Sequence, residues 1–265
     1  MRRHMVCVAL STTLAASGCA TTQNEQALEV EPTSQNSRLM RLAADLEKQG
    51  ATGTAIALYE QAASAPGAPA SAFVGLGDIY MRAGYIEQAI KSYQAALSRS
   101  PSYGPALVGL GWAMVRSGDA EAGIRTLAEG AQSVNTSQAY NRLGVAQTFA
   151  GQIQPAMDTF SRARSLAPDD PDISLNIALA AALADDSATA LTSVQELATS
   201  PNISLHHKRN IIMVYGLLGR ADETRALQLT GLSTEEVNKL LATARSIRAR
   251  PTVAARAEAL GSMNG

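Results

Sequence analysis

Two stretches of this sequence carry the same landmarks at the same spacing: FVGLGDIYMRAGYIEQAIKSYQAALSRSP at residues 73–101 and YNRLGVAQTFAGQIQPAMDTFSRARSLAP at residues 140–168. The matching positions are Leu76-Gly77 with Leu143-Gly144, Gly84 with Gly151, Ala89 with Ala156, Tyr93 with Phe160, Ala96 with Ala163, and Pro101 with Pro168. Between them, LVGLGWAMVRSGDAEAGIRTLAEG at residues 107–130 keeps Leu110-Gly111 and Gly118 in phase. The sequence therefore repeats with a period of about 34 residues, which indicates an array of stacked units.

The landmark residues suit two packed helices joined by a tight turn. Gly77 falls inside the first helix, where the absence of a side chain lets the second helix approach closely. Gly84 falls between the two helices and supplies the permissive backbone that the turn requires. Ala89, Tyr93 and Ala96 follow at helical spacing and form a small–large–small seam on the second helix. The repeat therefore predicts a helix–turn–helix unit that buries its apolar face by stacking on its neighbours.

This pattern resembles the tetratricopeptide repeat, which implies an all-α fold: a right-handed superhelical solenoid of about six helix pairs, closed by a C-terminal capping helix. The array is predicted over residues 36–230, in units at 36–69, 70–103, 104–136, 137–170, 171–204 and 205–230. Ser233 and Glu236 form a predicted capping box at the start of the capping helix, residues 231–250. Residues 19–35 are predicted to be a polar tether and residues 251–265 a flexible tail.

The start of the chain has the features of an export signal. Residues 1–18 combine a positive beginning, an apolar run too short to cross a bilayer, and small residues leading into Cys19. This arrangement resembles the lipobox of bacterial lipoproteins, which implies a covalent lipid on Cys19 as the only membrane anchor. Ala16 departs from the leucine that the pattern favours, and the alternative is an ordinary cleaved signal followed by a free cysteine. Ala20 directly after the cysteine implies delivery to the outer membrane, facing the periplasm.

The composition suits packed helices and excludes some classes of partner. Aromatic residues make up only 4% of the chain, which suits close contact between helices. The formal net charge is −1 and the chain has no basic run, so nucleic acid is not an expected partner. The two cysteines are Cys7, inside the signal, and Cys19, so no intramolecular disulfide is expected in the mature protein. Stability is therefore expected to come from packing alone.

Arrays of this kind bind partners along the first helix of each unit, and by that resemblance nine residues are predicted to line a protein-binding groove. They are Val74, Asp78, Arg82, Val108, Trp112, Arg116, Asn141, Val145 and Phe149. The set mixes apolar area with polar and charged side chains, as the docking of a peptide or helix requires. Trp112 is predicted to face the groove because aromatic residues are enriched at interface hot spots, and the alternative is that it only fills space between helices.

Candidate catalytic and metal-binding residues are few. The GLG triplets at residues 75–77 and 109–111 fall inside predicted helices, which argues against phosphate loops. His206 and His207 are adjacent rather than spaced as helical metal ligands, and are predicted to be surface residues at a helix start. The carboxylate pairs at 169–170 and 185–186 are expected to cap helices. We therefore predict a protein that is not an enzyme and that needs no metal or cofactor besides the lipid on Cys19; a catalytic site hidden in the groove is the alternative.

The closing segment narrows the functional prediction. RNIIMVYGLLGRADETRALQLTGLSTEEVNKLLATARSIR, residues 209–248, resembles the end of the TadD family, lipoproteins of the tight-adherence (Flp) pilus machinery. The resemblance implies an adaptor that assists assembly or localisation of the pilus secretion apparatus, including its outer-membrane secretin. The alternative is a general envelope scaffold that recruits periplasmic hydrolases or proteases, or an accessory to outer-membrane protein assembly.

Overall fold

The computed structural model describes residues 32–198, 203–225 and 231–261, and these ranges contain helices and no strand. The helices are α1 (Pro32–Lys48), α2 (Thr52–Ser64), α3 (Ala70–Arg82), α4 (Ile86–Arg99), α5 (Gly104–Arg116), α6 (Ala120–Val134), α7 (Ser137–Phe149), α8 (Ile153–Leu166), α9 (Pro171–Leu183), α10 (Ser187–Ala198), α11 (Leu205–Leu217), the 3₁₀ helix η1 (Ala221–Arg225), α12 (Thr234–Arg248) and α13 (Val253–Gly261). None of the described helices is both long enough and apolar enough to cross a membrane.

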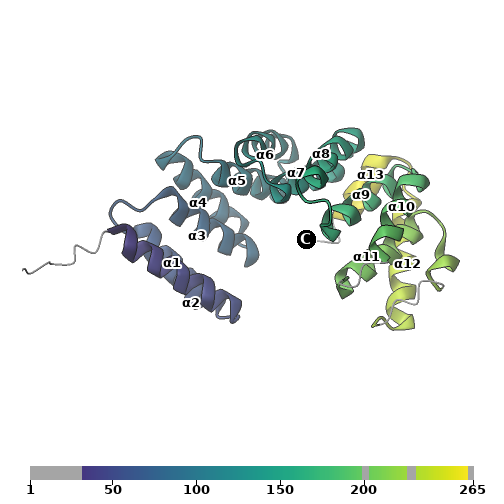
Figure 1. Ribbon diagram of the computed structural model, residues 1–265, viewed down its shortest axis with the longest axis horizontal. Helices are drawn as coiled ribbons and strands as arrows, with labels where there is room; N and C mark the ends of the chain where they lie inside the picture. Colours follow the sequence, from purple (N-terminus) through teal and green to yellow (C-terminus); the bar gives the residue numbers. More distant parts are fainter. Residues whose placement is uncertain (1–31, 199–202, 226–230, 262–265) are drawn as a thin grey trace, which may run out of the picture. The chain divides into compact units, whose positions relative to one another are not determined.

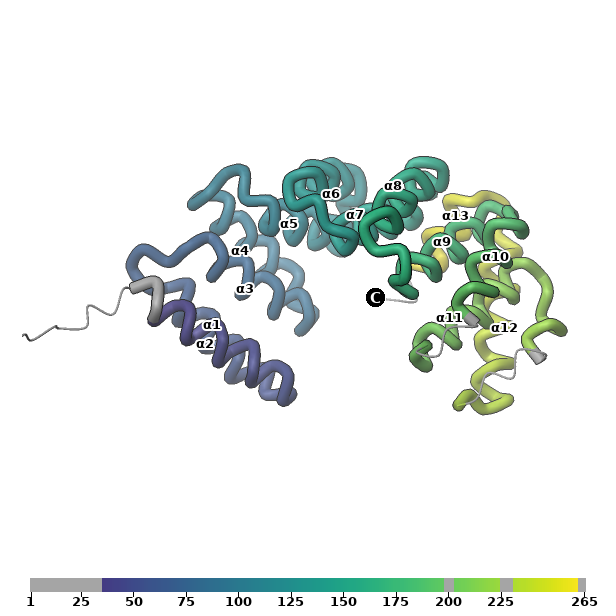
Figure 2. The backbone as a smooth tube through the Cα atoms, viewed as in Figure 1, coloured from purple at the N-terminus to yellow at the C-terminus, as the bar shows by residue number. Residues whose placement is uncertain are grey.

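The helices pack as consecutive pairs. α1 packs on α2, α3 on α4, α5 on α6, α7 on α8 and α9 on α10, and the second helix of each pair contacts the first helix of the next (Figure 1). The first helices also contact one another in order, from α1 through α3, α5, α7 and α9 to α11. The backbone trace shows the same succession (Figure 2). The all-helical solenoid predicted from the repeat is therefore confirmed.

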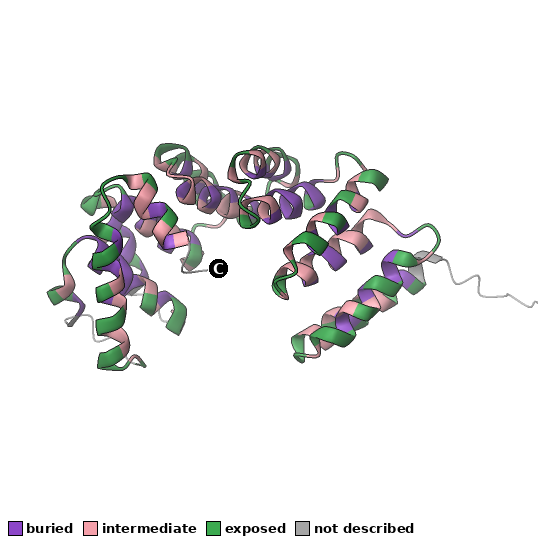
Figure 3. Cartoon of the chain, turned by 180° about the vertical axis from the view of Figure 1, so that it is seen from behind, coloured by how far each residue is buried: buried purple, intermediate pink, exposed green. Residues whose placement is uncertain are grey.

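The predicted seam is the core of each unit. Ala89, Tyr93 and Ala96 of α4 are buried, and so are Ala156, Phe160 and Ala163 of α8. These buried faces lie between neighbouring helices, while the opposite faces are exposed (Figure 3). Because alanine flanks each aromatic ring, the ring fills the space between two helices without pushing them apart.

Glycine and aspartate supply the turns inside the pairs. Gly84 and Gly151 have φ angles of +81° and +73°, in the left-handed region that glycine adopts readily. The fifth pair uses Asp185 at the equivalent turn, with φ of +60°. Asp185 also forms an ion pair with Arg256 of α13. The turn is therefore conserved in geometry along the array even where the glycine is replaced.

The third pair packs differently from its neighbours. A Cβ atom on Gly111 of α5 would lie 2.6 Å from the backbone nitrogen of Leu127 and 2.7 Å from the backbone oxygen of Gly123, both on α6. A Cβ atom on Gly130 would lie 2.6 Å from the backbone nitrogen of Val108. These glycines therefore bring the backbones of α5 and α6 into direct contact.

Both ends of the array differ from the prediction. α1 begins at Pro32, so the last residues of the predicted tether are helical. In the sixth unit, the second helix was expected before residue 230, but residues 221–225 form only η1, and α12 packs on α11 instead. The predicted capping helix is thus the partner of α11, and the predicted capping box of Ser233 and Glu236 is present at its start.

The prediction of a flexible tail was wrong for residues 253–261, which form α13. This helix contacts α7, α9 and α12, and it buries Ala257 and Leu260. Arg256 Nη1 donates hydrogen bonds to the carbonyl oxygen of Leu183 at 3.2 Å and to Asp185 Oδ2 at 2.7 Å. The C-terminal helix therefore packs against helices that lie far earlier in the chain.

Candidate protein-binding surface

The nine residues predicted to line a groove lie on α3, α5 and α7, at four-residue intervals on each. We call the first helices of the pairs the inner helices. α3 carries Val74, Asp78 and Arg82, α5 carries Val108, Trp112 and Arg116, and α7 carries Asn141, Val145 and Phe149. Four-residue spacing keeps each set on one face of its helix. All of them except Asn141 line one of the cavities described below.

Charged side chains surround a cavity of about 500 Å³ that α3, α5 and α7 form together with Tyr93 of α4. We call it the arginine cavity; the lining residues are Asp78, Met81, Arg82, Ala83, Gly84, Tyr93, Trp112, Arg116 and Arg142. A second cavity, of about 390 Å³, shares Asp78, Arg82 and Arg142 with it and adds Val74 and Val108. The structure thus brings together predicted residues from two helices and adds Arg142, which the sequence analysis did not select.

The arginine cavity carries a surplus of positive charge. Its one carboxylate, Asp78, accepts a hydrogen bond of 2.7 Å from the buried hydroxyl of Tyr93. Burial and then the charge of Asp78 raise the pKa of Tyr93, while Arg142 and Arg82 act in the opposite direction, so both arginines lie within electrostatic range of this hydroxyl. Arg82 is paired with Glu47 of α1.

Arg116 and Arg142 are available to a ligand. Among the residues that the structure describes, neither forms an ion pair. Arg116 is exposed and Arg142 is half-buried. Two guanidinium groups beside one carboxylate that already holds a hydrogen bond give a surface that favours negatively charged groups.

Trp112 combines the two roles that the sequence left open. Its side chain is half-buried and packs against the cluster that includes Val108, Leu127 and Leu143. It also lines the arginine cavity beside Arg116. The indole therefore contributes to the packing of α5 and presents part of its surface to the cavity.

A second, mostly apolar site lies at the C-terminal half of α7. This apolar cavity has a volume of about 290 Å³, and its lining residues are Val145, Thr148, Phe149, Phe160, Asn176, Leu179, His206, Arg209, Asn210, Met213, Leu240 and Leu260. Of these residues, only Val145 and Phe149 were predicted from the sequence to line the groove. The other side chains come from α7 itself, α8, α9, α11, α12 and α13, and residues so far apart in sequence show no common pattern before the chain is folded.

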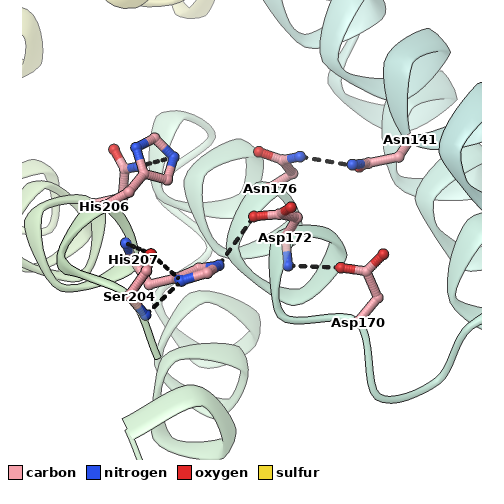
Figure 4. Close-up of polar contacts among 8 residues, drawn as sticks. Asn141, Asp170, Asp172, Asn176, Ser204, His206 and His207 are labelled. Atoms are coloured by element: carbon pink, nitrogen blue, oxygen red, sulfur yellow. Dashed lines mark hydrogen bonds and ion pairs between the residues drawn. The ribbon is translucent and has the colours of Figure 1, made fainter. Parts of the chain in front are cut away.

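Two polar residues of the apolar cavity, Arg209 and Asn176, are hydrogen-bonded to neighbouring helices. Arg209 Nη2 donates to Glu236 Oε1 at 2.9 Å, which joins α11 to α12. Asn176 Nδ2 donates to Asn141 Oδ1 at 2.9 Å, which joins α9 to α7 (Figure 4). The predicted groove residue Asn141 thus links two inner helices rather than lining a cavity. Apolar contact is left as the main interaction that this cavity offers.

A cluster of serine, histidine and aspartate joins α9 to α11. His207 Nε2 lies 3.0 Å from Asp172 Oδ1, and Ser204 Oγ lies 2.7 Å from His207 Nδ1 (Figure 4). His207 is 8% exposed, so the prediction of a surface residue was wrong for it, whereas His206 is exposed. Spacing within one helix shows which residues share a face, and it does not reveal a partner 35 residues away on another helix.

This cluster is a helix cap and not a catalytic triad. The Ser204 backbone N–H donates to His207 Nδ1 at 3.0 Å, and the His207 backbone N–H donates to Ser204 Oγ at 3.4 Å, which makes a capping box at the start of α11. The backbone amide therefore occupies the nitrogen that a general base would need for the serine proton. His206, not His207, lines the apolar cavity.

The predicted capping role of the acidic pairs is confirmed at two positions. Asp170 Oδ1 accepts from the Asp172 backbone N–H at 2.9 Å at the start of α9, and Asp186 Oδ1 accepts from the Thr189 backbone N–H at 3.1 Å near the start of α10. The described residues hold no group of three or more His, Cys, Asp or Glu side chains placed to bind a metal ion. Cys19, the predicted site of lipidation, lies outside the described residues.

Comparisons with known proteins identify the repeat. Two profiles described as tetratricopeptide repeat match residues 40–104 and 80–148. No curated protein matches the sequence. Among solved structures, PilW, described as a widely conserved type IV pilus biogenesis factor, is 18% identical with a TM-score of 0.69, over 78% of this chain and 98% of its own. Pseudomonas aeruginosa pilF is 16% identical with a TM-score of 0.63, over 80% and 98%.

A third solved structure has a similar fold. A tetratricopeptide repeat protein from Parabacteroides merdae is 16% identical with a TM-score of 0.60, over 83% of this chain and 87% of its own. At these identities the likeness shows a shared fold.

Proposed function

The chain has a tetratricopeptide-repeat fold, and on that premise we propose that it is a non-enzymatic adaptor that binds a segment of another protein along α3, α5 and α7. The observation that carries this proposal is the presence of the arginine cavity and the apolar cavity, to which α7 contributes residues in common. One presents Arg116 and Arg142 without ionic partners among the described residues, and the other presents apolar side chains. Concave sites with apolar area and a few charged groups are typical of peptide recognition.

The adaptor is proposed to serve the tight-adherence (Flp) pilus machinery at the outer membrane. Its closing segment resembles the TadD family, and its fold is shared with PilW, which is described as a type IV pilus biogenesis factor. A lipid on Cys19 would hold the chain to the membrane and leave the solenoid in the periplasm. The proposed partners are components of the secretion apparatus, including its secretin.

Two measurements test this function. Deleting the gene should abolish surface fibres while pilin is still made, because an adaptor acts on assembly. Normal fibres together with growth or permeability defects would instead favour the general envelope scaffold.

The second measurement concerns the surface itself. A photo-crosslinking amino acid at position 116, in the exposed part of the arginine cavity, should capture a pilus or secretin component in intact envelopes. The same amino acid at exposed position 125 on α6, which lines none of the cavities described here, is the control. Equal capture from both positions would contradict the proposed surface.

A further inference from the structure

Residues of α7 line both the arginine cavity and the apolar cavity. From this we infer the kind of segment that the two cavities bind. It is an extended stretch of a partner protein with clustered acidic residues and one bulky apolar residue about three positions away. This inference rests on the proposed adaptor function and gives that partner a chemical signature. The acidic cluster would bind in the arginine cavity and the apolar side chain in the apolar cavity.

Charge complementarity specifies the first half of the signature. The whole chain has a formal net charge of −1, so the arginine cavity is a local concentration of positive charge and not part of a basic protein. Arg82 is already paired with Glu47, whereas Arg116 and Arg142 have no ion pair among the described residues. A guanidinium pairs most strongly with a planar carboxylate, so aspartate or glutamate side chains are the groups that these two positions favour.

The geometry of α7 specifies the spacing. Arg142 lines the arginine cavity, and Phe149 and Val145 line the apolar cavity. Seven residues make almost two helical turns, so Arg142 and Phe149 lie on one face of α7, separated by about 10 Å along its axis. An extended chain rises about 3.3 Å per residue, so about three residues cover this distance.

The form of the apolar cavity favours an extended segment over a helix. A docked helix buries a continuous apolar stripe at positions i, i+3, i+4 and i+7. Here α7 contributes Arg142 to the arginine cavity and Phe149 to the apolar cavity, and the apolar cavity's volume of about 290 Å³ suits a single large side chain. An extended segment can place successive side chains in chemically different sites, as this surface requires.

Defined peptides test the inference on the full-length protein. The probe is a fluorescein-labelled Ser-Glu-Asp-Glu-Ser-Ser-Phe-Gly, together with its reversed sequence, because the chain direction is not specified. Binding is followed by fluorescence anisotropy at low and high salt. We expect at least one direction to bind, with affinity reduced at least about tenfold when the acidic residues become amides, when phenylalanine becomes alanine, or when the spacing is lengthened to seven.

Protein variants locate the two contacts. Arg116→Gln and Arg142→Gln should each weaken binding about fivefold, whereas Arg125→Gln, which removes an exposed arginine on α6, should not. Circular dichroism checks that each variant is folded. A photoreactive phenylalanine analogue in the peptide should crosslink to α7, α9, α11 or α12 around Val145, Leu179, Met213 or Leu240. This readout does not depend on any protein substitution.

Several outcomes would overturn the inference. Equal binding of the acidic and amide peptides, tighter binding at a spacing of seven, or crosslinks outside the apolar cavity each contradict the signature. Binding of anionic lipid vesicles in place of the peptides, or self-association that buries Arg116, would assign the surface to a different occupant. If envelope crosslinking captures a partner but the acidic peptides do not bind, the adaptor function stands and this signature is wrong. If neither occurs, both are wrong.

Discussion

A methyl group on Gly111 would lie 2.6 Å from the backbone nitrogen of Leu127, an atom that cannot rotate away. Gly111→Ala should therefore force α5 and α6 apart and lower the free energy of unfolding by about 2 kcal/mol. Urea denaturation followed by circular dichroism measures this change. The matched control is Gly53→Ala on α2, where nothing lies within 4 Å of the added methyl group. It should leave stability unchanged or raise it by about 0.5 kcal/mol, and equal losses in both variants would contradict the close contact.

Glu236 offers a prediction about pH. Hydrogen bonds from Arg209 and then from Ser233 lower the pKa of this carboxyl to about 2. Because the pKa in the folded protein lies below its usual value, the capping box stabilises α12 above the usual glutamate pKa and loses its effect as the pH falls toward 2. A carbon-detected NMR titration of the Glu236 carboxyl measures the midpoint.

The Glu236 titration has a matched pair of variants. Arg209→Met should raise the midpoint toward the usual glutamate pKa of about 4.3, because the first cause of the shift is removed. Arg125→Met on α6 should leave it unchanged. A midpoint near 4 in the unmodified protein would contradict the hydrogen bonds to Glu236 from both Arg209 and Ser233.

At the scale of single elements, an arginine side chain bonds α13 to the rest of the array. Arg256 donates to the end of α9, at Leu183 and Asp185. Arg256→Ala should increase amide hydrogen exchange in residues 253–261 about tenfold, while exchange in α3 to α6 stays the same. Arg250→Ala is the control, because only the backbone of Arg250 is bonded to Arg256. Uniform faster exchange along the whole chain would contradict local release of α13.

The elements differ in how far the sequence could predict them. The paired helices follow from Leu76, Gly84, Tyr93 and their counterparts, because each landmark has a role within its own unit. α13 has no such local signal. It has nine residues, fewer than an isolated helix needs to be stable in water, and depends on contacts with α7 and α9. Long-range packing of this kind is not visible in a local pattern.

The binding surface was predictable only where it repeats. Asp78, Arg82, Trp112 and Arg116 occupy equivalent positions of successive units, so the period of the sequence placed them together. The apolar cavity needs Met213, Leu240 and Leu260 from the irregular end of the array, and these have no repeat to align them. His207 was misjudged for the same reason, since its partner Asp172 lies on another helix.

For the molecule as a whole, the lipid predicted on Cys19 is expected to attach the protein to a membrane. Each buried methylene of a lipid contributes about 0.8 kcal/mol, so loss of the acyl chains should release the protein from the membrane. Cys19→Ser should move it to the soluble fraction after cell fractionation. The control is Cys7→Ser, which changes a residue inside the predicted signal and should leave the mature protein membrane-bound. Identical fractionation of the two variants would contradict lipidation of Cys19.

The crossing of α5 and α6 has a further consequence for the whole array. The pairs on either side pack against α5 and α6, whose backbones touch at these glycines. A change in the angle between α5 and α6 therefore displaces the distant pairs more than the near ones. The glycines at this crossing therefore affect the orientation of the first helix pairs as well as the packing of α5 on α6.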